Sequence, residues 1–311
     1  MAKILITESV HPIGPELLTA AGHTVVYADR DMDVIRREIV DADAVLVRII
    51  ELPGSLLATA KNLKIVSKHG VGYDNIDLDY CKSHGVAVTI TPNANSLSVA
   101  EHAFTLMLTL AKNIIPVSNE YRTVGFAAKN HAPGIEMTGK TLGLIGMGRI
   151  GKHVLHMCKD GLDMHVIVYD PYISEVPEGV EKVDDLSELL CRADVVTLHC
   201  LLTDETRKLI DRERLALMKP TALLINCARG PIVDEAALIE ALENGRLAGA
   251  GLDVTDPEPV APDSPLFKLP NVIVTPHYAP TTVESATRVS KIAAENINAV
   301  LAGQEPVGRI V

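Results

Sequence analysis

Short apolar runs alternate with amphipathic stretches along nearly the whole chain. This alternation is typical of βα units that stack into a parallel sheet with helices on both of its faces. It predicts an α/β fold. In the first third of the chain, enough apolar runs occur for a small doubly wound sheet, with strands at Lys3–Thr7, Thr24–Tyr27, Ala44–Val47, Lys64–Ser67 and Ala87–Ile90, separated by helical or turn segments such as Pro15–Ala21 and Asp33–Val40.

The stretch from Ser96 to Ile115 repeats apolar side chains at helical spacing and is too long for a parallel strand, so it predicts one long connecting helix. A second series of apolar runs follows it. This series has as many apolar runs as a complete dinucleotide-binding sheet has strands. The runs predict strands at Thr141–Ile145, His165–Tyr169, Asp194–Leu198, Ala222–Asn226, Gly249–Val254 and Val272–Thr275. Thr282–Leu301 is again helical, so the chain is expected to cross between two domains twice, near Ser98 and near Pro280.

A length of 311 residues also fits two domains, which we place at residues 1–97 with 283–311 and at 98–282. Hydrophobic residues make up 47% and charged residues 22%, as in folded globular proteins. The net charge of −11 disfavours nucleic acid as a partner, and the 3% of aromatic residues leaves few platforms on which bases could stack. The sequence has neither a leader-like start nor an apolar stretch long enough to span a membrane.

The cysteines at positions 81, 158, 191, 200 and 227 have no metal-ligand spacing, so no metal site is predicted. Their odd number fits reduced thiols in a cytoplasm. For Cys227, inside an apolar run, a buried structural thiol is favoured over a nucleophile, because no nearby histidine in the sequence could activate it.

The first chemical motif is GxGxxG, formed by Gly146, Gly148 and Gly151. It follows a predicted strand and opens an amphipathic helix, where helix N–H groups can bind a pyrophosphate. Gly148 would let the backbone approach the phosphates, and Gly151 would let the helix pack on the strand. The alternative is a tight βα turn that binds nothing.

Asp170 ends the next predicted strand, 19 residues after Gly151. A carboxylate about 20 residues beyond the motif meets the adenosine ribose hydroxyls in dinucleotide-binding sheets. Its charge would repel a 2′-phosphate, and no arginine follows it, so we expect NAD to be preferred over NADP. The alternative is a solvated aspartate at a strand end.

Polar side chains also follow three later strands: Arg229, Glu258 with Asp253, and His277. The carboxyl ends of strands in an open α/β sheet are where ligands bind. Taken singly, Arg229 fits a surface ion pair, Glu258 fits a solvated loop carboxylate, and His277 fits a core histidine. Together with GxGxxG, in this order, they resemble the D-isomer-specific 2-hydroxyacid dehydrogenase family, from about Asn62 to Thr282.

That resemblance implies two doubly wound domains around a cleft, a Rossmann NAD domain and a flavodoxin-like substrate or lid domain. It assigns Arg229 to substrate binding, His277 to acid/base chemistry and Glu258 to a partner of the histidine. It places Asp253 at the nicotinamide carboxamide, and it further assigns cofactor contacts to Arg149, Ile150, Thr206 and Cys227. The resemblance also implies a homodimer.

The chemistry agrees with these roles. Reducing a 2-keto acid needs a hydride at the carbonyl carbon and a proton at its oxygen, and imidazole is suited to donate that proton near neutral pH. A carboxylate beside the ring stabilises imidazolium, while a guanidinium can polarise the carbonyl and hold the substrate carboxylate.

In the first domain, the resemblance places a substrate-carboxylate loop at Gly70, Val71 and Gly72, a turn whose N–H groups could converge on an anion. Arg48 and Lys68 resemble phosphate-binding positions of phosphoglycerate dehydrogenases, and Asn95 matches a further substrate-side position. A substrate with a second anionic group follows as a hypothesis. The alternative, that Arg48 and Lys68 are ordinary bases facing solvent, stays open.

The expected function is an NAD-dependent oxidoreductase of a D-2-hydroxy acid or its keto form, of the phosphoglycerate or hydroxypyruvate type. Ile49, Leu201 and Tyr278 depart from the family pattern, so the exact substrate is not readable. Because the chain ends at Val311, serine control through a C-terminal regulatory domain is not expected. An NAD-sensing binding protein or corepressor on the same fold is the alternative.

Overall fold

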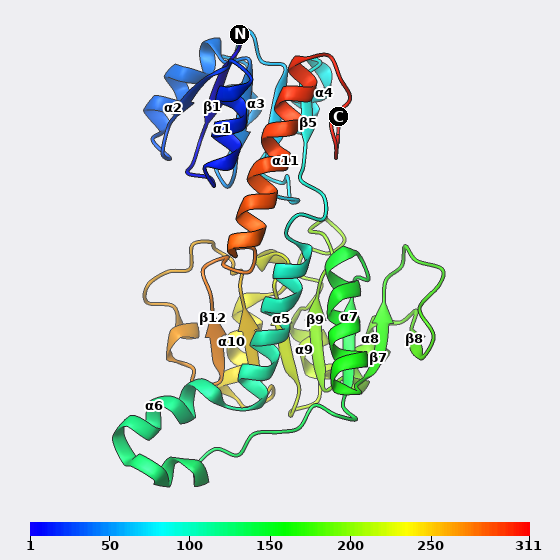
Figure 1. The fold of residues 1–311 in the computed structure, drawn as a ribbon. Coiled ribbons are helices and arrows are strands. Elements are labelled where there is room, and N and C mark those ends of the chain that lie inside the picture. The colour runs from blue at the N-terminus through cyan, green and yellow to red at the C-terminus, as the bar shows by residue number, and fades with distance from the viewer. The chain divides into compact units, whose positions relative to one another are not determined.

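A computed structural model describes residues 1–311 and divides them into two compact units (Figure 1). The N-terminal unit consists of Met1–Asn95 and Thr281–Val311, and the central unit consists of Ser96–Pro280. Both crossings lie two residues earlier than the sequence-based bounds. Both units are three-layered α/β folds, as predicted, and each is described by itself.

The N-terminal unit holds a five-stranded parallel sheet in the order β2-β1-β3-β4-β5. Its strands are β1 (Lys3–Ile6), β2 (Thr24–Tyr27), β3 (Ala44–Val47), β4 (Ile65–Lys68) and β5 (Ala87–Thr89). The first helices follow the strands along the chain: α1 (Ile13–Ala20), α2 (Met32–Glu38), the 3₁₀ turn η1 (Ile39–Asp41), α3 (Gly54–Leu57) and α4 (Leu78–Ser83). The last helix, α11 (Val283–Leu301), packs beside α1 against one face of the sheet.

The central unit holds seven parallel strands in the order β12-β11-β10-β9-β6-β7-β8. They are β6 (Thr141–Ile145), β7 (His165–Tyr169), β8 (Val180–Lys182), β9 (Val195–Leu198), β10 (Leu223–Asn226), β11 (Gly249–Leu252) and β12 (Val272–Val274). The predicted strands match these within two residues at each end, except for β8. That strand was missed because Val-Glu-Lys is a short charged edge strand without an apolar run.

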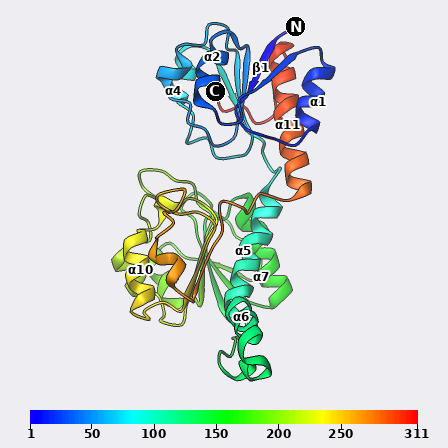
Figure 2. The same ribbon diagram turned by 90° about the vertical axis from the view of Figure 1, so that its left-hand side faces the viewer.

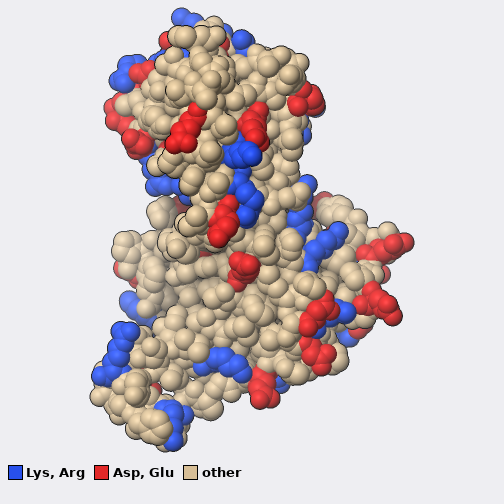
Figure 3. Space-filling view, in the orientation of Figure 1, with Lys and Arg blue, Asp and Glu red and all other residues tan.

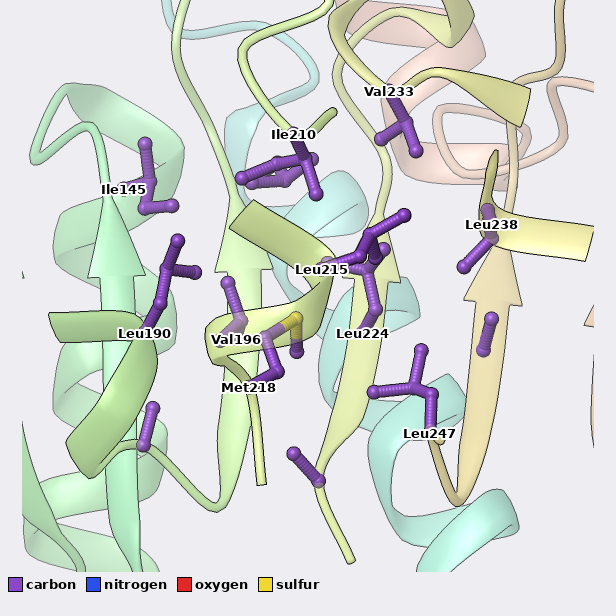
Figure 4. Close-up of a cluster of buried hydrophobic side chains, with 14 of the residues drawn as sticks. Ile145, Leu190, Val196, Ile210, Leu215, Met218, Leu224, Val233, Leu238 and Leu247 are labelled. Carbon is purple, nitrogen blue, oxygen red and sulfur yellow. The ribbon is translucent and has the colours of Figure 1, made fainter. Parts of the chain in front are cut away.

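Helices cover both faces of the central sheet, as the view in Figure 2 makes clear. The long helices α5 (Ser96–Ala111) and α7 (Arg149–Leu162) pack on one face. On the other face lie α8 (Leu186–Arg192), α9 (Arg212–Leu217) and α10 (Glu235–Glu243), with the 3₁₀ turns η3 (Gly230–Ile232) and η4 (Pro265–Lys268). Figure 4 shows the aliphatic core beneath them, in which Leu190, Leu224 and Leu238 are at most 1% exposed. Burial on this scale makes the sheet a rigid base for the loops at its carboxyl edge.

The single long helix predicted for Ser96–Ile115 is wrong: α5 ends at Ala111, and α6 (Ile114–Val124) starts in a new direction. Asn113, between them, has a φ of 51°, and its amide donates to the carbonyl of Pro133 at 3.1 Å. Asparagine tolerates this left-handed backbone. The proline at position 116 excludes a continuous helix, because its ring would collide with the carbonyl four residues earlier and it has no N–H to donate.

The helix α6 and the following 3₁₀ segment η2 (Gly125–Asn130) extend from the end of α5 (Figure 1), and we call residues 112–135 the arm. No residue of α6 is buried. None of the chain's helices combines the length and the hydropathy needed to cross a membrane. All five cysteines are unpaired; the cytoplasmic location expected from them stays a prediction.

Candidate active site

Three neighbouring strands of the central sheet carry the predicted catalytic residues. β10, β11 and β12 lie side by side and run in parallel. Arg229, Glu258 and His277 each follow one of them, in the loops at the carboxyl edge of the sheet. The topology therefore brings three side chains to one edge of the sheet, although the first and the last are 48 positions apart in the sequence.

His277 and Glu258 form a hydrogen-bonded pair. Nδ1 of His277 lies 2.7 Å from Oε1 of Glu258, and the two side chains are 32% and 36% exposed. A carboxylate partner holds the proton of the ring on Nδ1 and orients the imidazole, so Nε2 is left to exchange a proton with a ligand. This is the geometry of a histidine acid or base with a carboxylate partner.

The backbone of His277 is held in an unusual conformation. Its φ is 52°, in the left-handed region that residues other than glycine seldom adopt. Its N–H donates to the carbonyl of Asp253 at 2.8 Å. Such strain persists only where surrounding contacts determine it, so the direction of the imidazole is set by the loop between β12 and α11.

Arg229 stands in a tight loop after β10. The amide of Asn226 donates to the carbonyl of Arg229 at 3.0 Å, and its side-chain oxygen accepts from the N–H of Ala228 at 3.0 Å. A Cβ at the next residue, Gly230, would lie 1.9 Å from the carbonyl oxygen of Thr255. Only glycine allows this close backbone approach, which joins the arginine loop to the segment leading to Glu258.

Asp253 is 1% exposed, and both of its carboxylate oxygens accept hydrogen bonds from the loop that carries His277. Oδ1 accepts from Oγ1 of Thr275 at 2.6 Å and from the N–H of Tyr278 at 2.7 Å, and Oδ2 accepts from the N–H of Ala279 at 2.9 Å. The carboxylate thus satisfies donors of its own unit. Its predicted contact with a nicotinamide carboxamide stays a prediction.

The Gly-rich motif forms the turn from β6 into α7. Gly146 has a φ of 90°, and a Cβ on it would lie 2.8 Å from the backbone N of Cys200. A Cβ on Gly151 would lie 2.2 Å from the carbonyl oxygen of Gly146. At Gly148, which caps α7 without any side-chain hydrogen bond, an added Cβ would meet nothing within 4 Å. The open space beside Gly148, at the start of α7, fits a bound phosphate group.

Asp170 closes one side of this turn. Its Oδ2 accepts a hydrogen bond from the N–H of Met147 at 2.9 Å, and its Oδ1 accepts from the N–H of Tyr172 at 3.0 Å. The carboxylate is therefore fixed next to the Gly-rich motif at the end of β7. This placement fits the ribose-binding role predicted for it.

The other predicted cofactor residues take varied positions. Arg149 is exposed in the first turn of α7, and Ile150 beside it packs on the core. Oγ1 of Thr206 donates to the carbonyl of Leu201 at 2.6 Å and closes the loop after β9. Cys227 is buried, and burial together with the charge of Asp253 raises the pKa of its thiol well above the ordinary value. A neutral thiol agrees with the structural role favoured for Cys227.

In the N-terminal unit, Arg48 is carried by a loop that a buried carboxylate holds. Glu8, 2% exposed, accepts hydrogen bonds from the N–H groups of Arg48 and Ile49 at 2.7 Å and of Ile50 at 3.2 Å. The guanidinium of Arg48 donates to the carbonyl of Ser9 at 3.3 Å. The backbone donors of this loop are thus used internally, and the side chain of Arg48 is the group left to meet a ligand.

Lys68 points into the same loop. It is 8% exposed, and its Nζ donates to the carbonyl of Arg48 and to the side-chain oxygen of Asn75. This placement indicates a structural contact for Lys68, and its anion-binding role stays a prediction. Burial, and then the charges of Arg48 and Lys68, lower the pKa of the neighbouring His69 to about 3.

The rest of the predicted substrate loop is partly exposed. Gly70 has a φ of 142°, and its carbonyl accepts from the N–H of Thr91 at 2.9 Å. Val71 and Gly72 are half-buried. The side-chain oxygen of Asn95 is buried without a hydrogen-bond partner. The substrate roles of these residues stay predictions.

Comparison with known proteins decides the family. A model of the "D-isomer specific 2-hydroxyacid dehydrogenase, NAD binding domain" matches residues 104–279, more than half of the chain. The chain belongs to the D-isomer specific 2-hydroxyacid dehydrogenase family. The matched range includes the Gly-rich motif, Asp170, Arg229, Glu258 and His277.

Relatives within this dehydrogenase family differ in the substrates of their names. The D-3-phosphoglycerate dehydrogenase of Methanocaldococcus jannaschii is 43% identical over 98% of this chain and 58% of its own length. The chain thus spans little more than half of that relative. The glyoxylate reductase of Thermofilum pendens is 38% identical over 98% of this chain and 93% of its own. A solved structure of D-lactate dehydrogenase from Aquifex aeolicus, complexed with NAD and lactic acid, matches with a TM-score of 0.87 and 33% identity over 96% of each chain.

Sequence reasoning missed several polar residues that hold the loops of the predicted site residues in each unit. Glu8, Asn75, His102 and Thr275 all contact a loop that carries a predicted site residue. Glu8 and Thr275 come directly after or within a predicted strand end, where polar residues are also common for other reasons. A signal for Glu8 was its place at the carboxyl end of β1, the same edge at which ligands bind.

Proposed function

We propose that this protein is an NAD-dependent dehydrogenase that transfers a hydride between NAD(H) and a D-2-hydroxy acid or its 2-keto form. The observation that supports it most is the 2.7 Å pair of His277 and Glu258, in loops at the same edge of the sheet as the loop that carries Arg229. Reduction of a 2-keto acid requires an acid or base, here held by a carboxylate, and a cation for the substrate carboxylate, which a guanidinium at the same edge of the sheet can supply.

The residues divide the work as follows. The guanidinium of Arg229 binds the substrate carboxylate and polarises the carbonyl. In the reducing direction, Nε2 of His277 donates a proton to the carbonyl oxygen, and Glu258 stabilises the charged ring before that transfer. In the oxidising direction Nε2 accepts the same proton. When bound, the nicotinamide ring supplies or takes the hydride.

NAD is the cofactor that these side chains fit. The exposed N-terminus of α7 would hold the pyrophosphate, and the glycine at position 148 leaves the room that it needs. The carboxylate of Asp170 would accept hydrogen bonds from the adenosine ribose and repel a 2′-phosphate. Of these features, the carboxylate of Asp170 favours NAD over NADP, because both cofactors have the pyrophosphate.

We further propose that the substrate carries a second anionic group, a phosphate, sulfonate or carboxylate, as phosphoglycerate does; hydroxypyruvate itself has a single carboxylate. Two cationic side chains meet at this loop, because Nζ of Lys68 donates a hydrogen bond to the carbonyl of Arg48. Arg48 is the residue that would bind the group, because its backbone is fixed by Glu8 while its guanidinium is partly exposed.

A steady-state assay tests both parts. The enzyme is given NADH with hydroxypyruvate, glyoxylate, phosphohydroxypyruvate and sulfopyruvate in turn. We expect turnover of 2-keto acids, with the highest kcat/KM on a doubly anionic one. Tight binding of NADH without turnover of any of the four would overturn the dehydrogenase proposal and leave an NAD-sensing binding protein. Equal kcat/KM values on all four substrates would overturn only the proposal that the substrate carries a second anionic group.

We propose that the enzyme acts as a homodimer joined through the arm. Several large apolar side chains are exposed there, among them Phe126 at 72% and Tyr121 at 59%. Residues 112–135 contain three basic side chains and one acidic one, whereas the whole chain has a net charge of −11, so the arm is complementary to the rest of a second copy. Figure 3 shows Lys and Arg over this segment, at the lower left.

Sedimentation velocity measures this dimer. Phe126→Asp together with Tyr121→Asp should convert it to monomer, because two charges would enter an apolar interface. Phe267→Asp is the matched control, since Phe267 is 55% exposed on η4, outside the arm. A wild-type monomer, or a dimer that survives both arm substitutions, would overturn this assignment.

A further inference from the structure

His102 contacts the carboxylate of Asp253 and Thr275, a residue of the segment that leads to His277. It lies on α5, the first helix of the central unit, and its side chain is only 17% exposed. Its Nε2 lies 3.0 Å from Oγ1 of Thr275 and 3.5 Å from Oδ1 of Asp253. A residue 175 positions before His277 in the sequence is thus part of the same hydrogen-bonded group, since 277 − 102 = 175.

The chemistry of this group sets the direction of each hydrogen bond. The hydroxyl of Thr275 has one proton, which it donates to Asp253 at 2.6 Å. The oxygen of that hydroxyl is then an acceptor, so Nε2 of His102 must carry a proton and donate it. The chain of donors runs from His102 through Thr275 to Asp253, and the same carboxylate accepts the N–H groups of Tyr278 and Ala279.

His102 also contacts the loop through its ring. The ring of Tyr278, the residue after His277, lies edge-on to it with centroids 6.2 Å apart and planes at 62°. Such edge-to-face pairs are favourable at this separation. His102 therefore contacts the His277 loop at two points, through a hydrogen bond to Thr275 and an aromatic contact with Tyr278.

We propose that His102 is a positioning residue for His277. It holds the loop of residues 275–279 so that the backbone of His277 stays in its left-handed conformation and the imidazole meets Glu258. This inference rests on the proposed function, in which His277 is the acid and base. The φ of 52° at His277 is costly unless neighbouring contacts impose it. Asp253 supplies acceptors for that loop, and His102 with Thr275 keeps the carboxylate turned toward it.

The first experiment compares His102→Ala with His102→Gln. His102→Ala should lower kcat on 2-keto acids by about 10- to 100-fold, the loss expected when a reacting group is displaced by about 1 Å. His102→Gln should recover a large part of it, because its amide can donate to Thr275. NADH binding, followed by fluorescence, and the melting temperature should change little. The control is His165→Ala, an exposed histidine at the opposite, amino end of β7.

The second experiment combines His102→Ala with His277→Ala. If His102 acts through His277, it should cost nothing further once His277 is gone. Independent losses that multiply would overturn the proposal, as would wild-type kcat in His102→Ala or a loss of kcat that only follows a loss of folded protein. Wild-type activity of His277→Ala alone would instead overturn the proposed function.

Discussion

His277 and Glu258 are 19 residues apart in the sequence, yet Nδ1 of the histidine lies 2.7 Å from a carboxylate oxygen of the glutamate. Two adjacent parallel strands, β11 and β12, make this contact possible, because the loops after them leave the same edge of the sheet. The pair separates two functions of one ring. Nδ1 is taken by the carboxylate, and Nε2 is available for the substrate.

Replacing His277 tests that division. His277→Ala should lower kcat by about 10²–10⁴-fold, the usual contribution of general acid catalysis, while the dissociation constant of NADH stays within a few-fold. Glu258→Gln should give a smaller loss, since the ring remains and only the stabilisation of imidazolium is weakened. Steady-state kinetics and NADH fluorescence measure the two quantities. Full activity of His277→Ala would remove His277 from the mechanism.

Asp170 controls the choice of cofactor in our second prediction. Asp170→Ala should weaken NADH binding by about tenfold or more, the effect of losing a charged hydrogen-bond acceptor. It should also reduce the difference in affinity between NADH and NADPH. Asp170→Asn is the matched variant: it removes the charge but keeps an acceptor for Met147. Isothermal titration with each cofactor gives the affinities. Unchanged affinities for both cofactors in both variants would refute the assignment.

Much of the fold could be predicted because parallel strands buried on both faces are continuous apolar runs. The runs at Thr141–Ile145 and His165–Tyr169 match β6 and β7 at both ends. The strand β8 could not be found this way, because an edge strand of Val-Glu-Lys buries little. The break between α5 and α6 could have been read from the proline at position 116, which excludes the helical hydrogen bond that a continuous helix needs.

The site was predicted less completely than the fold. The residues at strand ends were placed by their motifs, and the structure brings Glu258 to His277. The sequence does not reveal that Lys68 is buried with its Nζ on a backbone carbonyl, or that Glu8 accepts three N–H groups of the Arg48 loop. Such contacts depend on loop conformation, and a lone Lys or Glu at a strand end looks the same whether it faces a ligand or the loop beside it.

Gly230 gives a third prediction, because a side chain at this position would overlap the backbone of Thr255. Gly230→Ala would place a methyl group 1.9 Å from that carbonyl oxygen, so the loop carrying Arg229 must move. We expect a loss of about 1–3 kcal/mol of stability, as in other overpacked sites, and a lower kcat/KM from the displaced guanidinium. Urea unfolding and steady-state kinetics measure these effects.

Gly161 is the control for that substitution. It lies in α7, and a Cβ on it would meet nothing within 4 Å. Gly161→Ala should therefore leave kcat/KM unchanged and stabilise the helix by up to about 1 kcal/mol. If Gly230→Ala behaved like Gly161→Ala, the close approach to Thr255 would have no consequence for the site.

His199 gives a prediction on pH. Burial lowers its pKa from 6.5 to about 3, so the folded state keeps the ring neutral while the unfolded state takes up a proton below about pH 6.5. Above about pH 6.5, the neutral ring costs the folded state nothing. As the pH falls from there towards 3, this histidine lowers the free energy of unfolding by about 1.4 kcal/mol per pH unit. His199→Gln should reduce the slope of unfolding free energy against pH by about this amount between pH 6 and 4.5. Urea unfolding at several pH values shows it, and an unchanged slope would contradict the burial of this ring.

Arg48 gives the last prediction, and it concerns the second anion of the substrate. Glu8 fixes the backbone of the Arg48 loop, so Arg48→Ala removes a guanidinium and leaves the three hydrogen bonds to Glu8 in place. A charge-assisted hydrogen bond contributes roughly 1.5–3 kcal/mol, and about 1.4 kcal/mol is a factor of ten. Arg48→Ala should thus lower kcat/KM by about 10- to 150-fold on phosphohydroxypyruvate or sulfopyruvate, and much less on glyoxylate.

The ratio of those two losses separates binding from folding. A damaged N-terminal unit would lower kcat/KM on every substrate alike, whereas a lost contact to a distal anion affects only substrates that have one. Arg48→Lys sharpens the comparison, because it keeps the charge but not the planar fork, so it should recover part of the loss on phosphohydroxypyruvate. Equal losses on glyoxylate and on the doubly anionic substrates, in both variants, would mean that Arg48 serves the fold or the carboxylate that all these substrates share, and the second anion would have to be abandoned.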